Sequence, residues 1–208
     1  MSISARAIRS DLPATMRIAL RPLAEAAALL RDRLALQRLP PFDGIATSDA
    51  EAEFAAVSQD DRDDIAAFAL CDVTTGGICG WASLMAIDWR HRHAQLGPAW
   101  WAGAADPRIG CHVAHLLLRM AFETLGLVRV EAQVLLADRA SCRVLDRLAF
   151  VREGTRRAGR CATDGRPADV APWSVVAARW PATARMQRAF LDEEDTPWRG
   201  RLPSIMPP

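Results

Sequence analysis

Residues 111–150, CHVAHLLLRMAFETLGLVRVEAQVLLADRASCRVLDRLAF, form the stretch of sequence that decides the fold. Apolar residues at helical spacing predict a helix over 111–125. Alternation of apolar and polar residues then predicts a strand over 128–136. A second apolar stripe predicts a short helix over 139–150, and Asp138 is suited to be its N-cap. The stretch therefore indicates a helix, a strand and a second helix in immediate succession.

The sequence before this stretch predicts mainly strands. Alternation predicts a strand over 16–23, and two β-rich runs on either side of the turn at 74–77 predict a hairpin. Helical spacing predicts a helix over 24–38. A strand over 94–101 contains Pro98, which cannot donate a ladder hydrogen bond, so we expect this strand to be an edge strand, bulged or splayed.

The sequence after the stretch completes an α/β (α+β) pattern. Two strands are predicted over 152–161 and 169–179, joined by a turn, and a closing helix over 180–191. Strands alternate with helices in the second half and form a hairpin in the first. This order predicts a mixed sheet with helices on both faces.

Composition limits the classes of function. Half of the 208 residues are apolar, and the net charge of +1 gives no general attraction to nucleic acid. No apolar run is long enough for a membrane span, and the first residues lack the apolar core of a signal peptide. Five scattered cysteines without a CxxC pair indicate neither a disulfide framework nor a metal site. We expect a cytoplasmic protein with no metal, no nucleic-acid partner and no membrane partner.

The expected organisation is one domain with two short extensions. Residues 1–15 are predicted to be an N-terminal extension, 16–191 a single domain, and 192–208 a charged, Pro-rich tail. The chain also has no Lys, Asn or Tyr, so all of its 26 basic residues are Arg. Neither a lysine Schiff base nor a tyrosine proton donor is therefore available.

Five short strings, in order, resemble the GNAT superfamily of N-acetyltransferases, and within it the Rim-type branch that acts on protein N-termini and small amines. They are LRPL near the start, LPPF at 39–42, LLLRMAFETLGLVRVEAQV, RASCRVLDRLAFVREGTRR and TDGRPADVAPWSVVAARWP. The resemblance covers about residues 16–191. It implies a GNAT fold, with a mostly antiparallel sheet splayed in the middle, and acetyl-CoA as co-substrate. Homodimers are compatible with this fold class.

The resemblance places the pyrophosphate of coenzyme A at the loop 105–110 and at the start of the helix that follows it. The N-terminus of a helix offers backbone N–H groups and a positive dipole end. The family's Gln/Arg-x-x-Gly-x-Gly/Ala loop is only partly matched, because Arg108 replaces the middle glycine. The pantetheine arm is expected along the end of the preceding strand. The cofactor-binding residues implied are Trp100, Trp101, Ala102, Arg108, Ile109, Gly110, Cys111, His112, Asp138, Ser141 and Arg143.

The resemblance also assigns two catalytic residues, Ser141 and Glu131. Ser141 would donate a proton to the leaving thiolate, and Asp138 stands where the family has Asn. Attack by an amine on a thioester is aided by a general base, for which Glu131 is the best-placed carboxylate. Each residue also has a structural interpretation: Asp138 as an N-cap, Ser141 as a residue of the first helical turn, and Glu131, which shares a strand face with Arg129 and Gln133, as a structural ion-pair partner.

Other groups were weighed for the same roles. His93 and His112 are further candidates for the base, since histidine titrates in the useful range. Gln95 stands where the family often has an acid, and it cannot serve as a base. Arg139 and Arg143 lie four residues apart on one helix face, in the region that approaches the 3′-phosphate of coenzyme A in the family, although a solvated basic face explains them equally.

These features predict an N-acetyltransferase that moves an acetyl group from acetyl-CoA to a peptide N-terminus or a small amine. The alternative is a GNAT-fold module that binds coenzyme A or a partner protein without catalysis. A thiol enzyme built on one of the cysteines is a third hypothesis, but no motif places a His–Asn pair near any of them.

Overall fold

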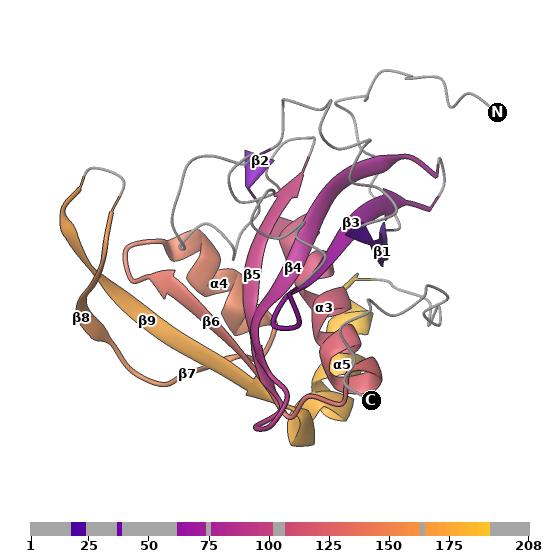
Figure 1. Ribbon diagram of the computed structural model, residues 1–208. Coiled ribbons are helices and arrows are strands. Elements are labelled where there is room, and N and C mark those ends of the chain that lie inside the picture. The colour runs from indigo at the N-terminus through magenta and orange to yellow at the C-terminus, as the bar shows by residue number, and fades with distance from the viewer. Residues whose placement is uncertain are drawn as a thin grey trace.

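The computed structural model describes residues 18–23, 37–38, 62–73, 76–101, 107–162 and 165–191. The two expected extensions and the greater part of the helix expected over 24–38 lie outside these residues. Figure 1 shows one twisted sheet with helices packed behind its strands. This arrangement confirms the predicted mixed α/β class with a single, mostly antiparallel sheet.

In the described part of the chain, nine strands build the sheet, and their order differs from their order in the chain. The order β1-β3-β4-β5-β6-β9-β7 runs across the sheet, while β2 pairs with β5 and β8 pairs with β9. Only β5 and β6 pair in parallel among these strands. The strands are β1 (Ile18–Pro22), β2 (Gln37–Arg38), β3 (Ala66–Asp72), β4 (Ile78–Asp88), β5 (His93–Trp101), β6 (Arg129–Leu135), β7 (Val151–Arg152), β8 (Arg156–Cys161) and β9 (Pro167–Val176).

Within the described residues, three α-helices accompany the sheet: α3 (Pro107–Arg119), α4 (Arg139–Arg147) and α5 (Trp180–Leu191). A π-helical turn, η3 (Met120–Thr124), extends α3, and a 3-10 turn, η4 (Ala177–Arg179), precedes α5. Helix α3 contacts both α4 and α5. None of the helices in the described part of the chain combines the length and hydropathy needed to cross a membrane.

The core lies between the sheet and α3, as the apolar stripes predict. Both stripes are buried almost completely, and the strand β6 alternates between buried and half-buried residues. Burying a large aliphatic side chain contributes about 1.5–3 kcal/mol, so these stripes fix how the helices dock. The buried stripe residues are Val113, Leu116, Leu117 and Met120 on α3 and η3, and Val144, Leu145 and Leu148 on and after α4.

The structure corrects several predicted boundaries. Helix α3 begins at Pro107, four residues earlier than expected, because proline is well suited to the first position of a helix. Gln37 and Arg38 form β2 instead of ending a helix, since the exposed edge of β5 offers them backbone partners. The strand that contains Pro98 lies between β4 and β6 in the sheet order, and of the alternatives expected for it, the bulge and the splay are present.

Candidate functional site

The sheet opens between β5 and β6. These two parallel strands are in register at only three positions, the last of which joins Gln95 to Glu131. Beyond that pair each strand continues, β5 to Trp101 and β6 to Leu135, with no further pairing between them. The splay expected from the resemblance is therefore present, and it leaves backbone groups of both strands without a strand partner on that side.

A bulge in β5 accompanies the opening. Ala82 pairs with Ala99 and Leu84 with Leu96, so β5 has one more residue than β4 over this stretch. The hydroxyl of Ser83 donates a hydrogen bond to the carbonyl of Pro98 at 3.2 Å. Such bulges bend a strand and re-aim its backbone, and here the bend coincides with the separation of β5 from β6.

Gly97 permits the tight approach of β4 at this bulge. A Cβ atom on Gly97 would overlap the Ser83 hydroxyl and would lie 2.6 Å from Cγ of Met85. No side chain fits there without displacing β4. Gly97 is thus present inside the strand for a steric reason. Pro98, which has no N–H to donate to the ladder, is tolerated because it lies at the bulge.

The short strand β2 covers the far end of the opening. Gln37 and Arg38 pair with Trp101 and Trp100, while β4 pairs with the same two residues on the opposite edge of β5. β2 therefore lies on the edge that β6 leaves, as Figure 1 also shows. Among the described residues of that edge, 96–99 have no strand partner. They directly precede Trp100 and Trp101, which were expected to contact the pantetheine arm.

The first turn of α3 follows this end of β5. Arg108 is exposed, Ile109 is half-buried and Gly110 is buried, and all three lie inside the helix instead of in the loop that was expected. The N–H groups of a first helical turn have no acceptor within the helix and present the positive end of its dipole. Cys111 and His112 follow in the same helix and are buried. Ala102 and the first two positions of the expected loop, 105 and 106, lie outside the described residues.

Asp138 and Ser141 stand at the start of α4, directly after β6. One carboxylate oxygen of Asp138, Oδ1, accepts hydrogen bonds from the backbone N–H of Ala140 at 3.1 Å and of Ser141 at 3.0 Å. The predicted N-cap is therefore correct. The other oxygen, Oδ2, is buried and has no hydrogen-bond partner among the described residues.

Ser141 is fully buried, and its hydroxyl lacks a partner within the described part of the chain. Leaving a buried polar group unsatisfied costs about 1–3 kcal/mol, so such groups call for a functional explanation. The N–H of Ser141 is fixed by Asp138, while its hydroxyl can still donate one hydrogen bond. This state is expected of a side chain whose hydrogen-bond partner is an atom of a bound ligand.

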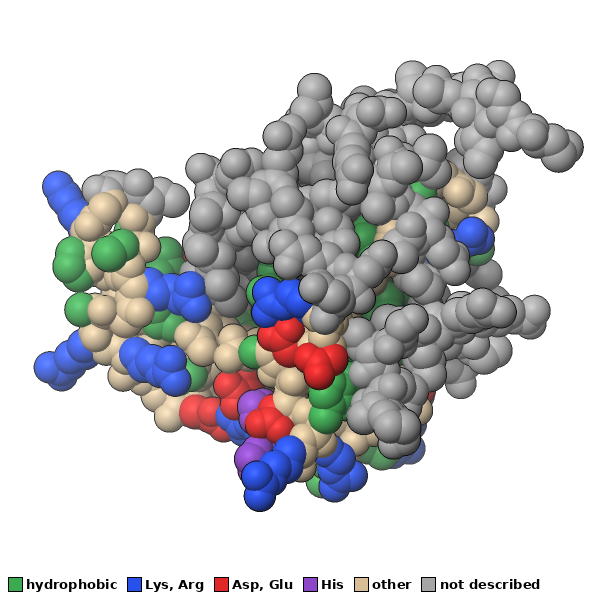
Figure 2. Space-filling view, in the orientation of Figure 1, with side chains coloured by type: hydrophobic (Ala, Val, Ile, Leu, Met, Phe, Trp, Pro, Cys, Tyr) green, Lys and Arg blue, Asp and Glu red, His purple; other side chains and the backbone are tan. Residues whose placement is uncertain are grey.

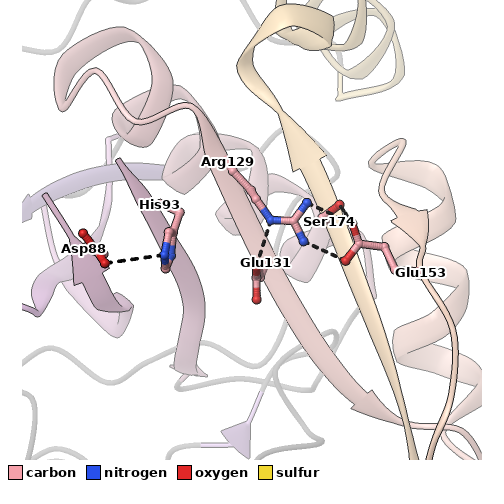
Figure 3. A network of polar contacts seen from close by, with 6 residues as sticks. All are labelled: Asp88, His93, Arg129, Glu131, Glu153 and Ser174. Atoms are coloured by element: carbon pink, nitrogen blue, oxygen red, sulfur yellow. Dashed lines mark hydrogen bonds and ion pairs between the residues drawn. The ribbon is translucent and has the colours of Figure 1, made fainter. Parts of the chain in front are cut away.

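Glu131 lies at the point where the strands separate, but its carboxylate is already engaged. Arg129 Nε donates to Glu131 Oε1 at 2.8 Å, and the remaining guanidinium nitrogens bind Glu153 at 2.9 and 2.7 Å. Ser174 Oγ donates to Glu153 at 2.8 Å. Figure 3 shows this network across β6, β9 and the segment after β7. It supports the interpretation of Glu131 as an ion-pair partner.

The network has electrostatic consequences for two of its members. The hydrogen bond from Arg129, and after it that from Ser174, lowers the pKa of Glu153 below its usual range. The same bond to Glu153, with a smaller contribution from Glu131, raises the pKa of Arg129. Nothing in the sequence joined residues 129 and 153, which are far apart in the chain, so sequence analysis missed this bridge.

The other candidate residues take varied positions. Arg143 is exposed on α4, one turn from Arg139, which is also exposed. His115 packs against Trp180 of α5 with ring centroids 5.4 Å apart, so it belongs to the helix interface. His93 begins β5 beside Asp88, two residues before Gln95, the last residue of β5 that pairs with β6.

Comparison with known proteins agrees with this architecture. A family model described as an acetyltransferase (GNAT) domain matches residues 17–151, which is more than half of the chain. The chain belongs to the GNAT acetyltransferase family. A search of curated protein sequences finds no match to it.

Solved structures give the same result for the fold. A GCN5-related N-acetyltransferase from Brucella melitensis is 27% identical with a TM-score of 0.58, and the match covers 68% of this chain. This chain spans 63% of the length of that protein, which is less than two thirds. A protein assigned to the acetyltransferases, with no substrate in its description, is 26% identical with a TM-score of 0.62, over 89% of this chain and 96% of its own. A variant of the spermidine N-acetyltransferase SpeG from Vibrio cholerae shares the fold at 17% identity and a TM-score of 0.59, covering 79% and 96% of the two chains.

The family uses acetyl-CoA as co-substrate, and the residues at the opening fit such a molecule. The unpaired edge at 96–99 can receive the amides of an extended arm. The buried hydroxyl of Ser141 and the buried Oδ2 of Asp138 are polar atoms with unused hydrogen-bonding capacity. The first turn of α3 provides N–H groups suited to an anion.

Proposed function

We propose that this protein transfers an acetyl group from acetyl-CoA to a primary amine, either a peptide N-terminus or a small amine. The observation that carries the proposal is the buried, unpartnered hydroxyl of Ser141 in the helix that follows the splayed strand β6. In the reaction the amine nitrogen forms a bond to the thioester carbonyl carbon, the carbon–sulfur bond breaks, and one proton passes from the amine to the departing sulfur.

Ser141 serves the sulfur side of this reaction. Its hydroxyl donates a hydrogen bond to the negative charge that develops on the departing sulfur, and a positioned proton donor contributes about 10²–10⁴-fold in rate. Asp138 positions it through the hydrogen bond to its backbone N–H. Because the chain has no tyrosine, no phenol competes for this role.

The remaining residues hold the co-substrate in place. The edge of β5 at 96–99 pairs with the amides of the pantetheine arm, and Ile109 and Gly110 present backbone N–H groups to the pyrophosphate. The exposed guanidinium groups of Arg108 and Arg143 add cations where phosphates lie. β2 closes the opening beyond 96–99 and so limits how far along β5 the arm extends.

Removal of the amine proton has no dedicated side chain comparable to Ser141 among the described residues. Glu131 is the carboxylate at the start of the opening, and its Oε1 already accepts a hydrogen bond from Arg129 Nε. We infer that the proton leaves mainly through solvent at the mouth of the site, with Glu131 in a supporting role. The Rim-type resemblance favours an acceptor with a free N-terminal amine.

A binding module without catalysis is the second candidate, and one observation favours it. Asp138 replaces the family's Asn, which puts an anionic group with a buried oxygen close to an anionic ligand. Like charges at close range weaken binding. The two functions differ in turnover.

The experiment that separates them is an amine screen with acetyl-CoA, following release of free coenzyme A by chromatography. We expect turnover with at least one N-terminal peptide or small amine, and a loss of about 10²-fold or more in Ser141→Ala. Thr183→Val, which removes a buried hydroxyl on α5, is the matched control and should retain activity. Turnover that is unchanged in Ser141→Ala would contradict the assignment of Ser141, and binding of acetyl-CoA without turnover on any amine would favour the module.

A further inference from the structure

The hairpin between β4 and β5 brings three metal-ligating side chains together at its closed end. Asp88 and His93 form the last pair of the ladder, and the loop 89–92 joins them. His91 Nδ1 lies 2.9 Å from Asp88 Oδ2, and His93 Nε2 lies 3.8 Å from the same oxygen. The three candidate ligand atoms all lie within 4.8 Å of one another. Figure 3 shows the ring of His93 facing Asp88 across the two strands.

The local fold holds these groups in place. The backbone N–H of His91 donates to Asp88 Oδ1 at 2.8 Å, which orients the carboxylate and directs its other oxygen to the two imidazoles. Arg92 adopts a positive φ of 53°, which tightens the loop. Because all three residues lie within six positions of the chain, their arrangement needs only the hairpin.

His93 supplies a second, independent observation. At 3.8 Å its Nε2 is too far from Asp88 for a hydrogen bond, and its Nδ1 is buried with no partner among the described residues. Both ring nitrogens therefore lack a hydrogen bond within the described part of the chain. Nε2, the ring nitrogen nearest Asp88, is the atom with unused capacity for a ligand at this cluster, and Nδ1 would keep the proton of the neutral ring.

We propose that Asp88, His91 and His93 bind one divalent transition-metal ion of the zinc class. Two imidazole nitrogens and one carboxylate oxygen are ligands that Zn²⁺ prefers, with a water molecule as the fourth. Metal–ligand bonds of about 2.0–2.2 Å place tetrahedral ligands roughly 3.3–3.6 Å apart. The distances of 2.9 and 3.8 Å bracket that spacing, so small side-chain movements form the site.

Binding changes the tautomer of one histidine. His91 Nδ1 must give up its proton to ligate, and the proton of the neutral ring then resides on Nε2. The side chain of His91 is 65% exposed, so water can accept that N–H. The positive charges of the exposed Arg90 and Arg92 repel the ion and weaken its binding. Arg129 is the register neighbour of His93, but its charge is balanced by its two carboxylate partners. We therefore expect affinity in the micromolar range, about −8 kcal/mol.

The three ligands lie at the opposite end of β5 from the first turn of α3. β5 has nine residues, and at about 3.3 Å per residue the strand separates His93 from the end near α3 by roughly 26 Å. His93 is two residues from Gln95, the register partner of Glu131, so the closed end of the hairpin adjoins the start of the opening along β5. The bound ion would thus act on the hairpin, by joining the ends of β4 and β5. Anything that binds only the folded state raises its apparent stability.

The test is calorimetric titration of untagged protein with ZnCl₂, in a Cys161→Ser background that removes the exposed thiol as a competing ligand. We expect one ion per chain, a higher unfolding temperature, and a visible absorption band with Co²⁺ that indicates tetrahedral ligation. His91→Ala and Asp88→Asn should weaken binding by about tenfold or more. Arg90→Ala, in the same loop but without a ligand atom, is the matched control and should not weaken it.

Two results would overturn the proposal. One is the absence of heat and of any shift in unfolding temperature at a zinc concentration of about 1 mM. The other is zinc binding by His91→Ala that is as strong as that of the parent. Circular dichroism without metal checks that this substitution, which lies in an exposed loop, leaves the fold intact. Neither result depends on acetyl transfer, so both leave the proposed function to its own test.

Discussion

Asp138 Oδ1 accepts a hydrogen bond from the backbone N–H of Ser141 at 3.0 Å, so the cap of α4 and the position of Ser141 are fixed by the same contact. The carboxylate thereby ties the end of β6 to the first turn of the helix. The hydroxyl of Ser141 is left buried and available at the opening of the sheet. Under the proposed function, capping and catalysis are linked through these two residues.

Substitution of Asp138 separates the two roles. Asp138→Ala removes the cap and should cost about 1 kcal/mol of unfolding free energy, whereas Asp138→Asn keeps an acceptor for the helix and should cost much less. Asp138→Asn also removes a negative charge near an anionic ligand, so coenzyme A should bind more tightly. Urea unfolding and calorimetry measure the two effects, and weaker binding by Asp138→Asn would contradict the placement of the ligand.

Gly97→Ala should destabilise the protein by about 1–3 kcal/mol, because the added methyl overlaps Ser83 and Met85. The measurement is urea unfolding at equilibrium. The control is the same substitution in a Ser83→Ala, Met85→Ala background, where the overlapping atoms are gone and the cost should shrink. An equal cost in both backgrounds would mean that the bulge has another cause.

Arg143→Ala tests the site of the 3′-phosphate. Because Arg143 is exposed on α4, its loss should weaken coenzyme A by about 1 kcal/mol and should leave 3′-dephospho-coenzyme A unaffected. Calorimetry with both ligands gives the comparison. Equal weakening of the two ligands would place Arg143 away from that phosphate.

Glu153 contributes to stability in a pH-dependent way. Its pKa is held below the ordinary value of 4.5 by the bond from Arg129, so its contribution is complete above that pH and is lost as the pH falls through the lowered value. For an exposed pair the effect is about 1 kcal/mol or less. Urea unfolding from pH 6 to pH 3 should show a smaller loss of stability in Glu153→Gln than in the parent, and parallel curves would contradict this contribution.

The sequence predicted the elements whose signals are local. The stripe of α4, the cap at Asp138 and the alternation of β6 depend on residues a few positions apart, so a single segment carries them. Pro98 left open an edge, a bulge or a splay, because the sequence shows which donor is missing but not which strand lies opposite, and the structure shows the bulge and the splay. The start of α3 was signalled by Pro107, a favourable first helical residue, and was placed too late.

The features that escaped prediction depend on residues distant in the chain. β2 has two residues and no periodicity, and it forms only because β5 offers an edge. The ion pair of Arg129 with Glu153 requires β6 and the segment after β7 to meet beside β9. The cluster of Asp88, His91 and His93 is local, and its spacing across a turn was a signal that could have been found.

The central claim is that the opening between β5 and β6 binds acetyl-CoA, with Ser141 next to its sulfur. Calorimetric titration of the parent protein and of Ser141→Ala with acetyl-CoA and with coenzyme A tests it most directly. The account predicts micromolar binding by the parent, and a loss in Ser141→Ala that is larger for coenzyme A, whose sulfur carries the hydrogen bond, than for acetyl-CoA. If the parent bound neither ligand at about 1 mM, the claim would be contradicted. The binding free energy would then be weaker than about −4 kcal/mol, far from the micromolar affinity that the account predicts.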